Sequence, residues 1–142
     1  MICSPDFRPK PWQDYWLWDC LDVVRPRIVV VEIQELWGPD LRRTRPYNPK
    51  HIASGADAIA QMGASLGAFR ELARRRGYRL AGCIALGFNA FFVRDDLPGV
   101  ESVLGGLDYN ATGCFAHVDA AWRAVLDRRR AQAERYTWVN PL

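Results

Sequence analysis

The stretch Arg27-Ile28-Val29-Val30-Val31-Glu32-Ile33 decides the fold class. Its apolar residues are mostly β-branched and follow one another without alternation, which is typical of a central, parallel strand that is buried on both faces of its sheet. Residues 65–76 then carry apolar side chains at helical spacing, between Ser65, which can cap the start, and Gly77, which can close the end. A buried strand followed by an amphipathic helix predicts an α/β protein.

Further elements are expected on both sides of this unit. Residues 12–24 carry aromatic and aliphatic side chains at three- and four-residue spacing, which predicts an amphipathic helix. Residues 78–84 and 88–94 are two apolar runs with a short connection, which favours a hairpin, and residues 118–135 have the stripe of a final helix. Residues 34–53 are rich in proline and predict a long loop at the carboxyl end of the first strand, where α/β sheets bind ligands.

The composition is that of an ordinary globular chain, with 142 residues, 49% of them hydrophobic and 25% charged. The net charge is only +3, and the arginine triplets 74–76 and 128–130 are expected in last turns of helices, so nucleic-acid binding is disfavoured. The longest apolar run, residues 81–93, is shorter than the roughly 20 residues of a membrane span. The four cysteines form no C-x-x-C pair, which disfavours zinc, and we expect a cytoplasmic protein with reduced thiols.

Five short blocks of sequence carry a family resemblance, and they come in the order and with the gaps that are expected for the family. They are Asp14-Tyr15-Trp16-Leu17-Trp18, RPRIVVVE at 25–32, GASL at 63–66, RGYRLAGC at 76–83 and NAFFVR at 89–94. Together they resemble a bacterial class I methyltransferase family that is related to the FkbM-type enzymes, which methylate oxygen atoms with S-adenosylmethionine. The resemblance covers residues 14–97.

The resemblance implies a partial Rossmann-like methyltransferase sheet flanked by helices. Residues 28–33 would be strand 5, residues 78–84 strand 6 and residues 88–94 strand 7, the last inserted antiparallel between the other two as part of a C-terminal hairpin. Strands 1 to 3 have no counterpart in these 142 residues. We therefore expect a Pro-rich segment at 1–13, the C-terminal half of a methyltransferase-like domain at 14–97, and a loop with an amphipathic helix at 98–142.

The elements with which the family binds its methyl donor are missing from the sequence. In the family a glycine-rich turn after strand 1 approaches the methionine part of the cofactor, and an acid at the end of strand 2 holds the ribose hydroxyls. No glycine pair here follows a buried strand and opens a helix. S-adenosylmethionine is thus the cofactor that the resemblance implies for the family, and we expect none to bind this chain alone.

Two functions stay open at this stage. The chain is either a truncated methyltransferase, inactive alone and completed by a separately encoded half, or a noncatalytic interaction module that forms a homodimer. The second alternative arises because truncation would uncover the edge of strand 28–33 and the apolar face of helix 12–24.

Three acids are candidates for a catalytic site. Asp6 lies where the family's strand 4 ends in acidic residues, and it either holds a metal or substrate hydroxyl or is a solvated residue on a Pro-rich arm. Asp14 either lines the cofactor pocket or offsets the dipole in the first turn of its helix. Glu32 is a carboxylate in an apolar strand, so it needs either a ligand or a buried arginine.

Overall fold

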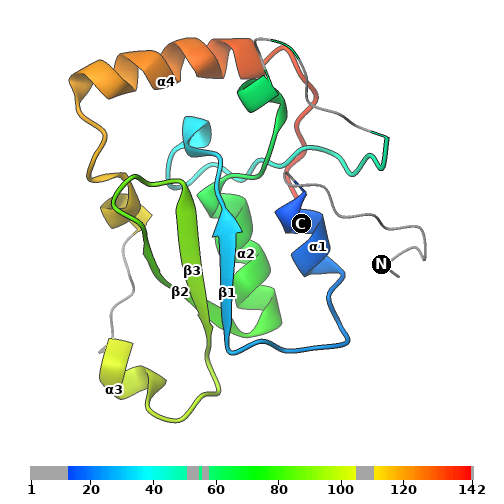
Figure 1. Cartoon of the computed structure of the whole chain (residues 1–142), viewed down its shortest axis with the longest axis vertical. Coiled ribbons are helices and arrows are strands. Elements are labelled where there is room, and N and C mark those ends of the chain that lie inside the picture. The colour runs from blue at the N-terminus through cyan, green and yellow to red at the C-terminus, as the bar shows by residue number, and fades with distance from the viewer. Residues whose placement is uncertain (1–12, 51–54, 56–57, 105–110, 142) are drawn as a thin grey trace.

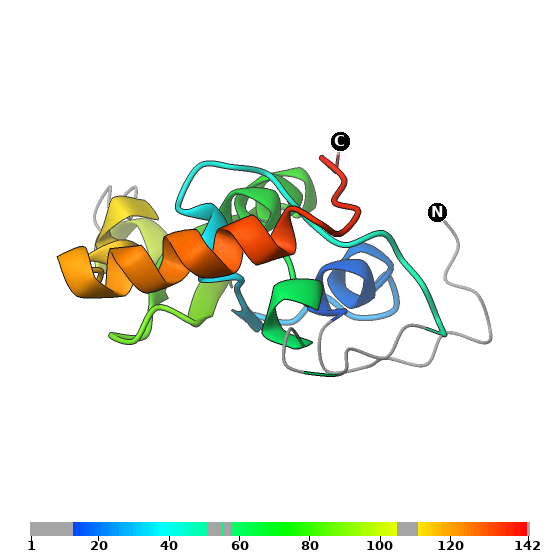
Figure 2. The same cartoon turned by 90° about the horizontal axis from the view of Figure 1, so that it is seen from above.

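The computed structural model describes residues 13–50, 55, 58–104 and 111–141 of this mixed α/β protein (Figures 1 and 2). Its helices and strands are α1 (Asp14–Asp19), β1 (Ile28–Glu32), α2 (Leu66–Arg76), β2 (Tyr78–Cys83), β3 (Asn89–Arg94), α3 (Val100–Leu104) and α4 (Ala120–Ala133). Short 3-10 helices lie at Glu35–Trp37, Ala58–Gln61 and Ala111–Phe115.

The three strands form one sheet of order β1-β3-β2, in which β3 runs antiparallel to both neighbours. β1 and β2 therefore run in the same direction. The predicted hairpin is confirmed, with Leu80 opposite Phe92 and a register shift just after it. α2 follows β1 in the chain and packs on one face of the sheet, while α1 lies on the side of β1 away from β3 (Figure 1).

β1 is an edge strand of this sheet, so the prediction of a central, parallel strand buried on both faces is wrong. Val31 is 4% exposed, whereas Ile28 is 60% and Val30 is 54% exposed. Alternate side chains of a strand point to opposite faces, so one row packs into the core and the other row faces solvent. Apolar and polar residues do not alternate in this strand, because the side chains that face solvent are mostly apolar as well.

α2 forms between the predicted caps, and this prediction is confirmed. The Ser65 hydroxyl accepts a hydrogen bond from the N–H of Ala68 at 3.2 Å, and Gly77 ends the helix in the left-handed conformation with φ of 75°. Phe69 and Leu72, which are 0% and 1% exposed, place the apolar stripe of the helix in the main core.

α1 is shorter than the helix predicted over residues 12–24. It ends at Asp19, and Val23, which is 89% exposed, lies beyond it. β-branched residues followed by a proline disfavour continuation of a helix, which accounts for the early end. The part of the expected apolar face that lies in α1 is covered, because Tyr15 and Trp18 pack around the ring of Phe69.

α4 lies across the end of the sheet at which β1 finishes and covers a second, smaller core (Figures 1 and 2). It occupies most of the predicted range, residues 118–135, and begins where the Asp119 carboxylate accepts the N–H of Trp122 at 2.7 Å. The second core contains Leu36, Trp37, Ala60, Leu126 and Ala133. Within the described residues, no helix combines the length and the apolar composition that a membrane crossing requires.

Cys83 at the end of β2 forms a disulfide with Cys114, so the prediction of reduced thiols is wrong. The 3-10 helix Ala111–Phe115 lies against β2 and carries Cys114, which is 3% exposed. No cysteine in the described part of the chain is free. Disulfides persist mainly in oxidising compartments, so the cysteines no longer support the predicted cytoplasmic location, which stays a prediction.

We expect this disulfide to contribute about 3–4 kcal/mol to stability, the chain-entropy value for a loop of this length, because it joins residues 31 positions apart. Replacing both residues, Cys83→Ala with Cys114→Ala, should lower the free energy of unfolding in urea by that amount. Dithiothreitol should remove the difference in stability between the native chain and the double variant. It also reduces the disulfide of Cys20, which both chains retain. An unchanged urea midpoint of the native chain under full reduction would contradict this expectation.

Candidate functional site

Two of the three predicted acids, Asp14 and Glu32, meet at the free edge of β1. The Asp14 carboxylate accepts a hydrogen bond from the backbone N–H of Glu32, with 3.1 Å between Oδ2 and N. The next N–H, that of Ile33, points the other way and donates to the carbonyl of Phe88 at 2.8 Å. Asp14 thus occupies part of the edge at which a further strand would pair. The third acid, Asp6, lies outside the described residues.

The two carboxyl groups affect each other's charge. Burial raises the pKa of Asp14, and the hydrogen bond from the backbone of Glu32 opposes that rise. Partial burial of its carboxyl and then the charge of Asp14 raise the pKa of Glu32. Glu32 as a whole is an exposed residue and forms no ion pair within the described residues, so the prediction of a buried arginine partner is wrong. Its side chain points out of the sheet on the solvent side.

A second polar cluster, missed in the sequence, lies just beyond the carboxyl end of β1. The Glu35 carboxylate lies 3.4 Å from Nε2 of His117 and 3.4 Å from Nε1 of Trp122. The His117 and Glu35 side chains are only 21% and 15% exposed. His117 packs on Gly87 in the hairpin turn, where an added Cβ would come within 2.1 Å of the imidazole. A half-buried imidazole beside a carboxylate can accept and hold a proton.

Neither cluster supplies a metal site by itself. In the ranges that the structure describes, no group of three or more histidine, cysteine, aspartate or glutamate side chains is placed to hold a metal ion. Asp14 and Glu32 bring two carboxylates together, and Glu35 and His117 bring one carboxylate and one imidazole together. The chemistry within reach of these residues is therefore proton transfer and hydrogen bonding.

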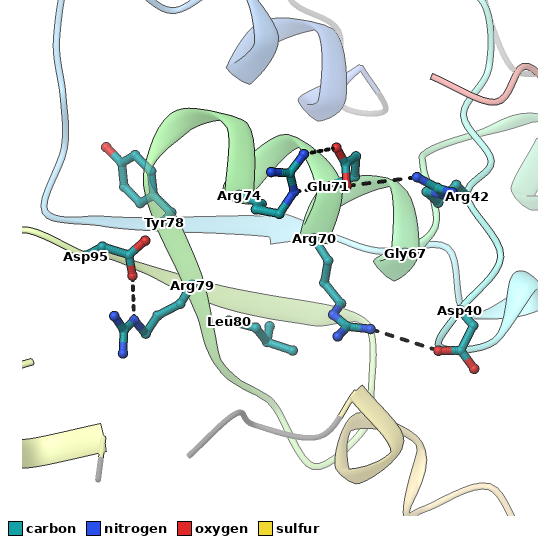
Figure 3. Close-up of a pocket in the computed structure, with 10 residues that line it drawn as sticks. All are labelled: Asp40, Arg42, Gly67, Arg70, Glu71, Arg74, Tyr78, Arg79, Leu80 and Asp95. Carbon is teal, nitrogen blue, oxygen red and sulfur yellow. Dashed lines mark hydrogen bonds and ion pairs between the residues drawn. The ribbon is translucent and has the colours of Figure 1, made fainter. Parts of the chain in front are cut away.

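A broad cavity of about 660 Å³ opens beside α2 and is lined by charged side chains of both signs (Figure 3). Its arginines, Arg42, Arg70, Arg74 and Arg79, reach toward Asp40, Glu71 and Asp95. Arg74 lies 2.7 Å from Glu71, whereas the pairs of Arg42 with Glu71 and Arg70 with Asp40 are both 3.9 Å long. Each of these guanidinium groups faces a carboxylate. We therefore interpret the cavity as a solvated network of ion pairs that contribute little to stability.

The first arginine triplet lies in the last turn of α2, as predicted. Arg75 lies 3.7 Å from Asp19 and Arg76 lies 2.8 Å from Asp22, so these cations tie α2 to the end of α1 and to the segment after it. Arginines engaged in this way are not arranged as a free basic stripe. That nucleic acid is not a partner stays a prediction.

The described residues do not fit S-adenosylmethionine. β1 leads through Ile33 and Gln34 into the 3-10 helix Glu35–Trp37, and the first glycine, Gly38, comes only after that helix. β2 leads into the hairpin turn and then into β3. Neither exit is a glycine-rich turn that opens an α-helix, which is the arrangement that lets backbone approach a nucleotide cofactor. We therefore assign no part of methyl-donor binding to these residues.

No family model matches the chain, and no curated protein or solved structure is significantly similar to it. The resemblance to methyltransferases therefore rests on the five sequence blocks alone.

Asp14→Asn should keep the contact with the N–H of Glu32 and remove a partly buried charge. Because the pKa of Asp14 is raised in the fold, its contribution to stability is fully present below the ordinary aspartate pKa and is lost as the pH rises through the raised value. The free energy of unfolding in urea should be the same for the variant and the native chain at about pH 3. At about pH 7 that of the variant should be equal or higher. Asp14→Ala, which also removes the acceptor, should be about 1 kcal/mol less stable than Asp14→Asn. If the free energy of unfolding of the native chain rose relative to that of Asp14→Asn as the pH increased, the argument would be contradicted.

Proposed function

We propose that this chain forms the carboxyl-terminal half of a class I methyltransferase-like fold and acts together with a donor-binding half supplied by other residues. The observation that carries the proposal is the strand order β1-β3-β2, with β3 antiparallel between two strands that share one direction. Sequential strands are neighbours in most sheets, so a simple three-stranded meander would give the order β1-β2-β3. The observed order is the one that the resemblance implies for strands 5, 7 and 6.

The free edge of β1 supports the same proposal. In the complete sheet of the family, strand 4 would pair along this edge. The last part of this edge is occupied, because Asp14 binds the N–H of Glu32 and Ile33 forms a parallel bridge with Ala64. The alternation of the ladder directs the backbone groups of Ile28 and Val30 outward. A docking donor-binding half would find these groups available for pairing.

The Glu35 and His117 pair lies at the end of the sheet where open α/β folds bind ligands. Methylation of a hydroxyl releases a proton, and a neutral imidazole is a group that can accept one. In the assembled enzyme that we propose, His117 is therefore the base on the acceptor side, held in place by Glu35 and by Gly87.

Alone, the chain should not bind S-adenosylmethionine in the micromolar range, because the described strand exits lack a glycine-rich turn. Isothermal calorimetry with the folded 142-residue chain tests this expectation. The same titration with S-adenosylhomocysteine controls for binding of the product form. Tight, saturable heat from either compound would overturn the division into two halves.

A second candidate is a noncatalytic module that pairs with its own copy through β1. Ile28 and Val30 are more than half exposed, and their partners in the ladder, Val93 and Phe91, lie on the same face and are partly exposed. An apolar row beside an unpaired edge is a common site of strand pairing between chains. The aromatic side chains of Tyr15 and Trp18 do not contribute to this argument, because they are buried.

If β1 pairs between copies, the native chain should have the mass of a dimer or larger species in light scattering at micromolar concentration. Val30→Lys should restore the mass of one chain, because a lysine on an edge strand opposes pairing. Leu86→Lys is the matched control, since Leu86 is 66% exposed but lies in the hairpin turn. A native chain with the mass of one copy and a cooperative melt would exclude the homodimer.

A further inference from the structure

A buried hydrogen-bond donor without an acceptor lies beneath α4. Trp37 is 4% exposed, and its indole N–H has no hydrogen-bond partner within the described residues. The Trp37 ring packs edge-on against Trp138 at 4.8 Å, and above Trp138 stands Arg45, whose buried Nε also lacks a partner. Buried donors almost always have acceptors, so two orphans in one aromatic cluster indicate that an acceptor is missing there.

A pocket of about 240 Å³ lies at this cluster and is named here the Trp37 pocket. It is lined by Trp37, Arg43, Arg130, Glu134, Tyr136 and Trp138. These residues come from the loop after β1, from α4 and from the C-terminal segment that follows it, and these parts lie side by side in both views (Figures 1 and 2). Thr44 and Val139 exchange backbone hydrogen bonds of 3.0 and 2.9 Å, which holds the C-terminal segment against the loop.

The polar groups of the Trp37 pocket are mostly donors. Arg43 forms no ion pair with any residue that the structure describes. Arg130 stands 5.4 Å over the Trp37 ring, and its only carboxylate within those residues is Glu134, 3.8 Å away and 62% exposed. A carboxylate is the group that best matches a planar guanidinium and an indole N–H together.

We propose that the Trp37 pocket binds a small aromatic carboxylate. The carboxylate accepts hydrogen bonds from the indole N–H of Trp37 and from the guanidinium of Arg43, while the ligand ring lies against Tyr136 and Trp138. The volume is about eight times that of a water molecule in the liquid, which suits a single substituted ring. An aromatic ligand fits better than an aliphatic one because the apolar walls are themselves aromatic. The site is separate from the β1 edge and does not rest on the proposed function.

Sodium benzoate is the probe, and the readout is the side-chain indole N–H signal of Trp37 in a proton–nitrogen NMR spectrum. We expect this signal to shift in a saturable way, and calorimetry to give the same affinity. Trp37→Phe keeps an aromatic ring and removes only the donor, so it should weaken benzoate binding by about tenfold or more. Trp122→Phe is the matched control, because the indole of Trp122 already has Glu35 as its acceptor. It should bind benzoate like the native chain.

Benzamide has the same ring without the charge and should not bind detectably. Arg43→Gln should weaken benzoate binding as Trp37→Phe does, whereas Arg123→Gln, an exposed change on α4, should leave it unchanged. If Trp37→Phe does not fold, the benzoate affinity of Arg43→Gln alone tests the proposal. The proposal fails if benzoate does not shift the Trp37 indole signal, or if benzamide binds as well as benzoate.

Discussion

The hydroxyl of Ser65 is the contact on which the rest of the structure depends. It is fully buried, donates to the carbonyl of Leu41 at 2.5 Å, and accepts from the N–H groups of Arg43 at 2.9 Å and Ala68 at 3.2 Å. One side chain therefore caps α2 and also fixes the long loop against that helix, with its hydrogen-bonding capacity used in full. Gly67 permits the close approach, since a Cβ there would meet the carbonyl oxygen of Leu41 at 2.7 Å.

The position of this loop determines how the two cores of the molecule are joined. Once the loop is held on α2, Thr44 can pair with Val139, and the C-terminal segment can close over Trp37. The main core under the sheet and the smaller core under α4 share few apolar contacts of their own. A further tie is polar, namely the pair of Glu35 with His117, whereas the disulfide of Cys83 with Cys114 lies within the main core.

Local signals made much of the fold predictable, and distant contacts did not. α2, the hairpin and α4 were predictable because caps, periodicity and a short connection are all encoded within one segment. The exposure of one face of β1 was not predictable. A run of apolar residues looks the same in the sequence whether a helix or solvent covers the second face of the strand. Asp14 and Glu32 meet through a backbone N–H that no residue pattern reveals, and Glu35 and His117 are 82 positions apart.

The contrast between the two cavities shows which feature indicates a ligand. The cavity beside α2 holds more arginines, but each one faces a carboxylate and lies where water can also satisfy it. The indole N–H of Trp37 is buried and has no acceptor among the residues that the structure describes. A buried donor without an acceptor is therefore a stronger indicator of a ligand site than a cluster of charged side chains. The same reasoning applies to the edge of β1, where backbone groups without a neighbouring strand are the feature that indicates a partner.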